Sequence, residues 1–459
     1  MSADWAHDAI VYHLYPLGAL GAPARNDGRS APVNRLAELE AWIPHWQALG
    51  VNTLYLGPLF ESVTHGYDTT DYGLVDRRLG DNAALARLVR TLHAAGFRVI
   101  LDAVLNHVGR RHAAFRDLQR HGARSRYAAW FKGLRFDRGN PAGDPFDYET
   151  WAGHHELVKL DLTHPEVRAH LLEAVTAWIR EFDIDGLRLD AADVMDLGFL
   201  RDLATHCKGL RPDFWLMGEV VLGDYSQWAN GEALDATTNY EAYDGLHRAH
   251  NDRDYGRIAH ALARQFGPRG VYRGLPLYAF ADNHDVDRIA SLLARPAHLF
   301  PLHVLLFTMP GVPSVYYGSE WAVPGRKGKT TDAPLRPALR PPQPGDPRTG
   351  HALARAIARL TRLRQQVPAL RRGDYHPIAA TAEQLVFERR YGGSAARVAV
   401  NAADRPVTLT LEPPDGREGR WVDVLNPGEA FLVRRGRPAA ATLYPTWGRV
   451  LVFEPARVG

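Results

Sequence analysis

The stretch Gly186-Leu-Arg188-Leu-Asp190-Ala-Ala-Asp193 is a short apolar run that is interrupted by an arginine and ends in an aspartate. Because side chains alternate between the two faces of a β-strand, Arg188 and Asp190 are expected on the same face. A neighbouring guanidinium lowers the pKa of a carboxyl and keeps it ionised, as a nucleophilic carboxylate requires. Taken alone, Asp190 could also be the N-cap of a helix that follows the strand. The rest of the chain decides between these two interpretations.

Similar apolar runs recur along the first three-quarters of the chain and alternate with amphipathic helical segments. This alternation is typical of β-α units that build a parallel sheet. Eight such runs predict an α/β fold, the (β/α)8 barrel. The candidate strands are residues 10–15, 51–57, 98–104, 186–190, 214–219, 234–238, 277–281 and 312–316. Candidate helices include residues 36–49, 82–95, 165–182, 254–266, 297–307 and 351–366.

Two parts of the chain break this alternation. Residues 108–160 lack the β-α rhythm and are rich in arginine, glycine and aromatic residues, so we expect a small inserted domain there. Residues 372–459 show short strand-like runs, which predict a C-terminal antiparallel β-sandwich. The barrel would then comprise residues 1–107 and 161–371, with the proline-rich stretch 334–347 as a surface loop. The candidate strands of the sandwich are residues 385–390, 397–401, 407–411, 420–425, 430–434 and 449–453.

The composition is that of an ordinary globular protein and excludes several classes. With 55 lysine and arginine residues against 52 aspartate and glutamate residues, the net charge is +3, and no basic tract indicates a nucleic-acid partner. The single cysteine, Cys207, excludes an internal disulfide. The chain shows no signal-peptide pattern and no run of about eighteen apolar residues, so we expect a cytoplasmic protein without a membrane partner.

Ionisable side chains follow several predicted strands, at the ends where the active sites of barrels lie. Glu219 ends the fifth strand and Asp285 follows the seventh, so that with Asp190 three carboxylates reach one rim. An ionised Asp190 beside Arg188 and a protonated Glu219 between apolar neighbours would form the pair that glycoside hydrolysis requires. Asp285 would then bind sugar hydroxyls and favour the oxocarbenium-like transition state. The same rim is expected to hold Asp102, His107 and His284.

Each of these motifs also has a structural explanation when it is taken alone. Asp102 with Asn106 and His107 could be ordinary turn chemistry. Glu219 could be a solvated residue at a strand end, and His284 could be a histidine that only makes structural hydrogen bonds. Their occurrence together, each at a separately predicted strand end, favours the catalytic interpretation.

These segments resemble the four short regions of the α-amylase superfamily of retaining glycoside hydrolases, and they occur in that family's order. Three further stretches are similar to the family: Gly66-Tyr-Asp-Thr-Thr-Asp-Tyr72, Leu157-Val-Lys-Leu-Asp-Leu-Thr-His-Pro165 and Gly311-Val-Pro-Ser-Val-Tyr-Tyr-Gly-Ser-Glu320.

The resemblance implies a role for each residue at the rim. Asp190 would be the nucleophile, Glu219 the general acid/base and Asp285 the residue that stabilises the transition state. Arg188 would orient the nucleophile, and Tyr67 would stack beneath the sugar. The substrate-binding residues that the resemblance implies are Tyr67, Asp102, His107, Arg188 and His284.

Within the superfamily, the chain looks most similar to the cyclomaltodextrinase, neopullulanase and maltogenic amylase group, including hydrolases of cyclic maltosyl-maltose. Members of that group usually carry an N-terminal β-domain that contributes to dimerisation. The first strand here begins near residue 10, so we expect that domain to be absent, and a homodimer is left open. Asp190 is followed by Ala191-Ala-Asp-Val194, without the Lys-His pair of many endo-acting α-amylases. We expect no cofactor; a structural calcium ion is left open, although no motif supports one.

The sequence therefore predicts hydrolysis of α-1,4-glucosidic bonds in short linear or cyclic malto-oligosaccharides. A transglycosylase or isomerase of the same superfamily is the alternative, since it would use the same three carboxylates. A binding protein without activity would have lost them, and a metal-dependent hydrolase would need a ligand spacing such as H-E-x-x-H, which is absent. Candidates for stacking on sugar rings, with packing in the core as the alternative, are Trp130, Phe131, Trp151 and Trp321.

Overall fold

Parallel strands from the first three-quarters of the chain form the centre of the molecule. The computed structural model describes residues 3–456, and within them an eight-stranded parallel sheet has the order β11-β10-β9-β5-β2-β1-β13-β12. A parallel bridge between Thr238 and Tyr278 joins its two edges and closes the sheet into a barrel. The predicted barrel is thus confirmed, with each strand inside its predicted run: β1 (Val11–Leu14), β2 (Thr53–Leu56), β5 (Arg98–Ala103), β9 (Gly186–Leu189), β10 (Trp215–Gly218), β11 (Ala236–Thr237), β12 (Tyr278–Phe280) and β13 (Val312–Tyr316).

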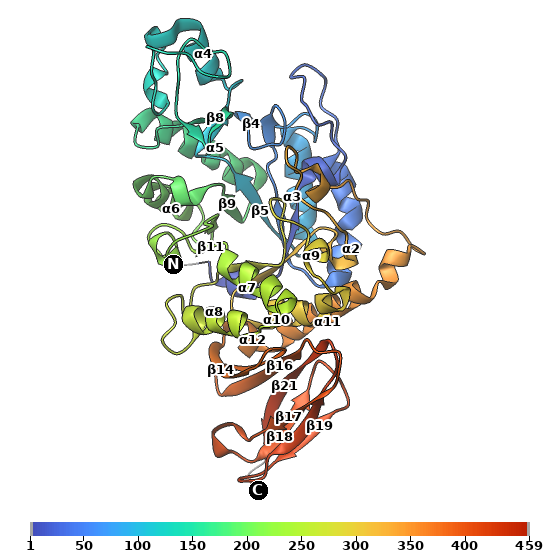
Figure 1. The fold of residues 1–459 in the computed structure, drawn as a ribbon. Coiled ribbons are helices and arrows are strands. Elements are labelled where there is room, and N and C mark those ends of the chain that lie inside the picture. Colours follow the sequence, from blue (N-terminus) through green and yellow to red (C-terminus); the bar gives the residue numbers. More distant parts are fainter. Residues whose placement is uncertain (1–2, 457–459) are drawn as a thin grey trace.

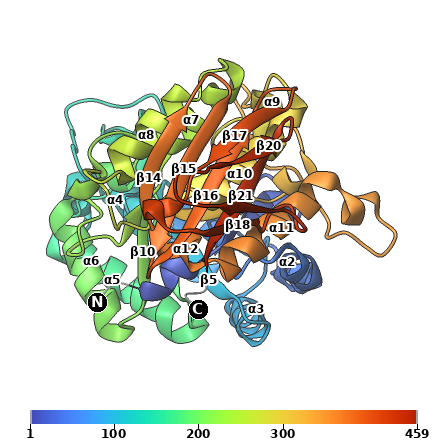
Figure 2. The same ribbon diagram turned by 90° about the horizontal axis from the view of Figure 1, so that it is seen from below.

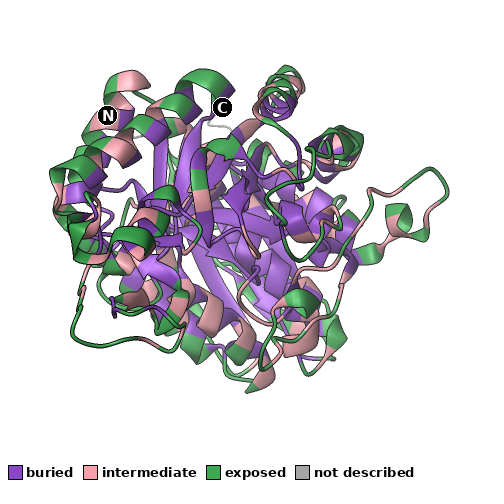
Figure 3. Ribbon diagram, turned by 90° about the horizontal axis from the view of Figure 1, so that it is seen from above, coloured by how far each residue is buried: buried purple, intermediate pink, exposed green. Residues whose placement is uncertain are grey.

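Helices surround the barrel and cover the outer face of its strands (Figures 1 and 3). The inner face is buried by the side chains that fill the barrel. Carboxylate and amide side chains begin several of them: Asp81 accepts the backbone N–H of Ala84, and Asp196 accepts that of Phe199. Gly50 ends α2 in the left-handed region, where φ is +83°. The main helices are α2 (Ile43–Leu49), α3 (Asn82–Ala94), α5 (Pro165–Phe182), α6 (Leu197–Leu210), α7 (Tyr240–Asn251), α8 (Gly256–Phe266), α10 (Leu299–Thr308) and α11 (Ala352–Gln366). None of the helices within the described residues is long and apolar enough to cross a membrane.

A small antiparallel sheet and a short helix stand above the barrel after β5 (Figure 1). Its strands, in the order β6-β8-β7, are β6 (His107–Gly109), β8 (His154–Lys159) and β7 (Thr150–Trp151), and the helix is α4 (Ala113–His121). The ring of Phe115 packs edge-on against those of Phe131 and Tyr148, and all three are buried. The aromatic richness of this stretch therefore serves mainly its own small core. After β2, a hairpin of β3 (Phe60–Ser62) and β4 (Thr69–Val75) also rises at this end.

The C-terminal strands form the expected β-sandwich. One sheet has the order β14-β15-β16-β21-β18-β19, and β17 and β20 pair as the second layer. The prediction missed β14 (Asp374–Ala380), an exposed edge strand that contains Pro377, and β20 (Ala439–Leu443), whose three alanines carry no strand signal. The remaining strands are β15 (Gln384–Tyr391), β16 (Ser394–Asn401), β17 (Val407–Leu411), β18 (Gly419–Asp423), β19 (Ala430–Val433) and β21 (Trp447–Pro455).

Two buried arginines bind the carbonyls at the end of α10, and one of them joins the sandwich to the barrel. Seen from below, the C-terminal strands lie over α10 and α12 (Pro368–Arg372) (Figure 2). Arg389 of β15 donates to the carbonyls of Thr308 and Leu370 at 2.8 and 2.9 Å. Arg364 of α11 donates to the carbonyls of Phe307 and Met309 at 2.9 and 3.3 Å. These carbonyls include the last of α10, where the helix dipole is negative, so the two cations satisfy the helix end. Arg389 also joins the sandwich to the barrel.

Replacing Arg389 with methionine tests this junction. The change leaves several buried carbonyls without a donor, so we expect the free energy of unfolding to fall by about 2–4 kcal/mol in urea titrations. Arg420→Met removes an exposed arginine from the same sandwich, which forms an ion pair with Glu454, and should change stability by no more than about 1 kcal/mol. An equal decrease in the free energy of unfolding in both variants would contradict the role of Arg389 in the junction.

Candidate active site

The sequence-predicted site residues lie at the carboxyl ends of neighbouring barrel strands. Asp102 is in β5 and Arg188 in β9, and the two residues are partners in the parallel register. Asp190 and Glu219 directly follow β9 and β10, which are also paired. Asp285 follows β12 across the barrel. Because all these strands run in one direction, their carboxyl ends open on one rim.

The guanidinium of Arg188 joins three of the carboxylates. Its Nη1 lies 2.8 Å from Asp102 Oδ1 and 2.9 Å from Asp190 Oδ1, and its Nη2 lies 2.7 Å from Glu219 Oε2. The arginine is only 3% exposed. One buried cation therefore fixes the positions of two carboxyl groups on adjacent strand ends, with Asp102 as a third partner from a neighbouring strand.

Asp102 lies behind this cation and is fully engaged. Its Oδ2 accepts hydrogen bonds from the hydroxyls of Tyr55 and Tyr67, at 2.8 and 2.9 Å, while its Oδ1 binds Arg188. Asp102 is buried and has no oxygen left for a ligand. It holds Arg188 and Tyr67 in place from behind the site.

A sharp turn after Asp190 brings a backbone N–H to Glu219. Ala191 has a φ of +50°, an unfavourable conformation for a residue with a Cβ. In this conformation its N–H donates to Glu219 Oε2 at 3.1 Å. Glu219 Oε2 thus accepts this N–H and pairs with Arg188, whereas Oε1 has only the hydroxyl of Tyr240 at 3.5 Å.

Burial raises the pKa of Asp190 and that of Glu219. For Asp190, burial outweighs the opposing effect of Arg188, and repulsion from Glu219 adds to the rise. For Glu219, burial again raises the pKa against the effect of Arg188. From the sequence we expected Arg188 to lower the pKa of Asp190 and keep it ionised. Arg188 does oppose the rise in this pKa, but burial is the larger effect. The two groups therefore keep a shared proton to higher pH than isolated carboxyls.

Asp285 is in the opposite electrostatic situation. His284 Nε2 lies 2.9 Å from its Oδ2, and Arg336 Nη2 lies 3.0 Å from its Oδ1. Burial alone would raise the pKa of Asp285, but His284, Arg336 and Arg188 together hold it far below its usual value. This carboxyl is therefore an anion at neutral pH.

The two histidines and Tyr67 form the wall between these carboxylates. Tyr67 and His284 stack with ring centroids 5.4 Å apart, and the tyrosine hydroxyl contacts His284 Nε2. His107 donates from Nε2 to the carbonyl of Tyr67 at 3.0 Å and lies 3.9 Å from Asp190 Oδ2. Burial lowers the pKa of His107 to about 3, so it is neutral at physiological pH. The structure thus brings together all eight residues that the sequence singled out.

A family model for the α-amylase catalytic domain matches residues 39–348, which is more than half of the chain. The chain belongs to the α-amylase family of glycoside hydrolases. It is 33% identical to a cyclomaltodextrinase of Geobacillus thermopakistaniensis over 93% of this chain and 74% of that one. It is 30% identical to neopullulanase 2 of Thermoactinomyces vulgaris, over 98% of this chain and 78% of that one.

A solved structure of similar architecture covers nearly the whole chain. The cyclic α-maltosyl-(1→6)-maltose hydrolase of Arthrobacter globiformis, in complex with cyclic α-maltosyl-(1→6)-maltose, has a TM-score of 0.81 and 28% identity. The match covers 98% of this chain and 99% of that one. The expected family and the expected group of relatives are therefore confirmed.

Sequence reasoning missed one residue of this α-amylase-family site, Arg336. It comes from the proline-rich stretch that we expected to be a surface loop, but its side chain turns inward. Besides Asp285, its Nε donates to the carbonyl of His284 at 3.0 Å, and its guanidinium lies over the ring of Tyr15, 4.6 Å from the centroid. The sequence carries no local signal for this contact, since the loop is long and has no periodic pattern.

Most of the candidate stacking aromatics are packing residues. Trp130 and Phe131 are buried in the small core above the barrel, and Trp321 is buried against Trp42. Trp151 differs, because it is partly exposed and its ring lies 6.0 Å from that of His107. It is therefore the candidate from this set that borders the site.

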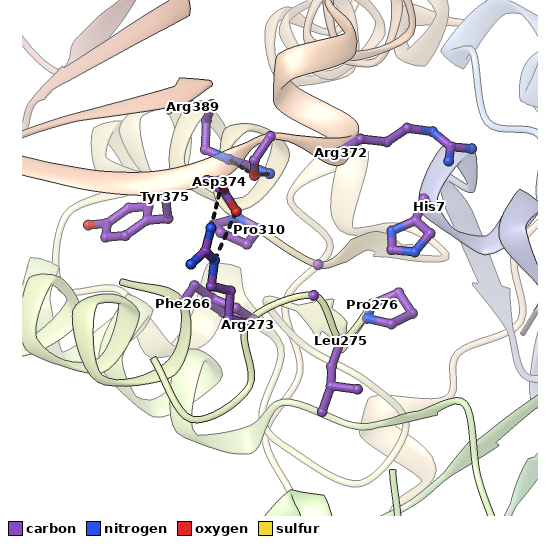
Figure 4. A pocket seen from close by; sticks show the side chains of 13 residues that line it. His7, Phe266, Arg273, Leu275, Pro276, Pro310, Arg372, Asp374, Tyr375 and Arg389 are labelled. Carbon is purple, nitrogen blue, oxygen red and sulfur yellow. Dashed lines mark hydrogen bonds and ion pairs between the residues drawn. The ribbon is translucent and has the colours of Figure 1, made fainter. Parts of the chain in front are cut away.

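A separate cavity opens at the other end of the barrel, between its base and the sandwich (Figure 4). Its lining includes Leu275 and Pro276 just before β12, and Pro310 just before β13, so it lies at the amino ends of the strands. Across it, Arg273 pairs with Asp374 at 2.7 and 3.1 Å. The catalytic candidates are all at the opposite rim. Across the described residues, no cluster of three or more histidine, cysteine or acidic side chains is arranged to hold a metal ion.

Replacing Arg336 with methionine tests its contact with Asp285. We expect kcat/KM to fall by about tenfold or more, because a charge-assisted hydrogen bond is lost. Removing the cation raises the pKa of Asp285, so the acid limb of the pH profile of kcat/KM should move to higher pH.

Two matched variants control this experiment. Arg336→Lys keeps the positive charge and should leave the acid limb close to that of the parent. Arg326→Met removes an exposed arginine from the same loop, which pairs with Asp287, and should change neither kcat/KM nor the pH profile. An unmoved acid limb in Arg336→Met would contradict the assignment.

Proposed function

We propose that the protein hydrolyses α-1,4-glucosidic bonds of short linear or cyclic malto-oligosaccharides, with retention of the anomeric configuration. The observation that carries this proposal is the guanidinium of Arg188, which binds Asp190 and Glu219 at once on adjacent strand ends. Double displacement at a sugar needs two carboxyl groups held close together. The relatives support the substrate class, because their names describe enzymes acting on cyclodextrins and other maltose oligomers.

In the first step, Asp190 attacks the anomeric carbon. Its Oδ1 is bound to Arg188, so Oδ2 is the oxygen available as nucleophile. Oε2 of Glu219 accepts the N–H of Ala191 and forms an ion pair with Arg188, so the proton shared by the pair is carried on Oε1. That proton passes to the glycosidic oxygen as the bond between this oxygen and the anomeric carbon breaks. A bond from Asp190 Oδ2 to the anomeric carbon forms in its place.

In the second step, water replaces the ester. Glu219 is now ionised and takes a proton from a water molecule, whose oxygen attacks the anomeric carbon. The ester bond to Asp190 breaks, and the carboxylate returns to Arg188. Two inversions at one carbon restore the original configuration.

Asp285 and the Tyr67 wall serve the transition state. Positive charge develops on the sugar ring in both steps, and an ionised Asp285 stabilises it. The ring of Tyr67, stacked on His284, provides a flat apolar surface beneath the sugar. The hydroxyl of Tyr67 is bound to Asp102, which fixes the orientation of the ring.

We further propose a division of labour along the chain. Residues 1–107 and 161–371 form the catalytic barrel, residues 108–160 a small domain that walls the cleft, and residues 372–459 the sandwich. The antiparallel pairing of β6 with β8, and the position of Trp151 beside His107, support the second of these assignments.

A cytoplasmic location is supported by a relative named as an intracellular maltogenic amylase of Bacillus subtilis, which is 31% identical over 62% of this chain.

Variants of the two carboxyls test the mechanism. We expect Asp190→Asn and Glu219→Gln each to lower kcat on maltotriose by about a thousandfold or more, because each removes a group that forms or breaks bonds. Glu232→Gln, an exposed residue further along the same loop, should keep parental activity and is the matched control. Proton NMR of the first product should show the α-anomer before mutarotation. Early appearance of the β-anomer would exclude double displacement.

A substrate panel tests the substrate class separately. Maltotriose, a cyclodextrin, cyclic maltosyl-maltose, pullulan and starch are compared at equal mass, with products resolved by chromatography. We expect the three short or cyclic substrates to be cleaved with a higher kcat/KM than either polymer. A preference for starch would contradict the proposal while leaving the mechanism intact.

A further inference from the structure

Two loop segments beside Glu219 expose aliphatic side chains at the mouth of the site. Val194 is 48% exposed, Val221 is 41% exposed and Leu222 is 80% exposed. Large apolar groups seldom remain this exposed next to one another unless something covers them. We call Val194, Val221 and Leu222 the aliphatic rim.

Backbone contacts place the two segments side by side. The N–H of Asp193 donates to the carbonyl of Glu219 at 3.3 Å, and the N–H of Val221 lies 3.5 Å from the carboxylate of Asp193. Val220, which lies between Glu219 and Val221 in the chain, is buried. Its N–H and its carbonyl both form hydrogen bonds with the hydroxyl of Thr238. The side chain of the next residue, Val221, is exposed, and its backbone lies beside Asp193, which precedes Val194 in the chain.

The rim has few groups that could bind the hydroxyls of a sugar. Residues 191–194 read Ala-Ala-Asp-Val and residues 219–222 read Glu-Val-Val-Leu, so they contain no lysine, arginine, hydroxyl or amide side chain. The one carboxylate besides Glu219, that of Asp193, faces the backbone of Val221. The hydroxyl of Thr238 is engaged by the backbone of Val220, and that of Tyr240 lies 3.5 Å from Glu219 Oε1.

The position of the rim assigns it to one side of the bond that is cleaved. In the proposed function, on which this inference rests, Glu219 gives its proton to the leaving group. The leaving group must therefore lie beyond Glu219, where the residues that follow it in the chain are Val220, Val221 and Leu222. An apolar leaving group removes these side chains from water, which a hydroxylated sugar does less completely.

We propose that the aliphatic rim is a binding site for apolar aglycones, so that the enzyme cleaves α-glucosides of aryl and alkyl alcohols and transfers glycosyl groups to such alcohols. In the transfer reaction, the alcohol oxygen attacks the anomeric carbon of the glycosyl ester on Asp190. The ester bond breaks, the new glycosidic bond forms, and the alcohol proton passes to the Glu219 carboxylate. The reaction is balanced and needs no other reactant.

The experiment uses α-glucosyl fluoride as donor, because its small leaving group vacates the rim once the glycosyl ester has formed. Benzyl alcohol and glucose are supplied together at equal concentration, and the ratio of benzyl glucoside to disaccharide is measured by chromatography. For the unmodified protein we expect benzyl glucoside to exceed disaccharide. In Val221→Thr and in Leu222→Gln the ratio should fall by about five- to tenfold, from the lost apolar contact area. Val194→Thr, on the other segment, should lower it as well.

Leu432→Gln is the matched control, because Leu432 is 62% exposed on β19 of the sandwich, and this variant should keep the parental ratio. Fluoride release reports the proposed function by itself. An unchanged product ratio in all three rim variants, with fluoride release intact, would overturn this inference alone. If Leu222→Gln instead separates a dimer into monomers in light scattering with no change in ratio, the rim is a contact between two copies of the chain.

Discussion

The site depends on one buried positive charge. Arg188 is almost inaccessible to water, and a guanidinium is tolerated there only because carboxylates neutralise it. Asp102, Asp190 and Glu219 all contact it, which gives more negative charge than it can balance. Burial and mutual repulsion raise the pKa of the last two, so one proton stays with the pair. Because three carboxyl groups surround a single cation, two chemically similar groups, Asp190 and Glu219, can act as nucleophile and general acid.

The barrel makes this arrangement possible because its strands are parallel and in a fixed register. Asp102 and Arg188 are neighbours across β5 and β9, and Glu219 follows β10 next to them. A one-residue shift in either pairing would turn one side chain to the opposite face of the sheet. The packing of the strands, which are buried on both faces, therefore also controls the electrostatics of the site.

The sequence predicts features that depend on neighbouring residues, and it misses features that depend on contacts between distant segments. The strands could be predicted because burial on both faces imposes continuous apolar runs. The catalytic candidates could be predicted because they lie at the ends of these strands. The role of Arg336 could not be predicted, since its contact with Asp285 depends on the path of a long loop without a pattern. Nor could the sequence show that burial outweighs Arg188 at Asp190, because the pKa depends on how completely the fold excludes water. The strands β14 and β20 were missed for a local reason. β14 is an exposed edge strand with a proline, and β20 contains a run of alanines, so neither carries a strand signal.

The two sides of the active site, at the carboxyl end of the barrel, differ in the kind of side chain that they present. On the Asp285 side, charged groups are held in place before any ligand arrives: His284 and Arg336 flank the carboxylate, and Tyr67 is fixed between His284 and Asp102. Such preorganised groups recognise one ring and one distribution of charge, because any displacement leaves a buried charge unpaired. On the Glu219 side, the side chains of Val194, Val221 and Leu222 are aliphatic and exposed. Contacts of that kind have no preferred direction, so they exclude water without selecting a particular pattern of hydroxyls. A site with this asymmetry is strict about the sugar that it activates and permissive about the group to which that sugar is attached.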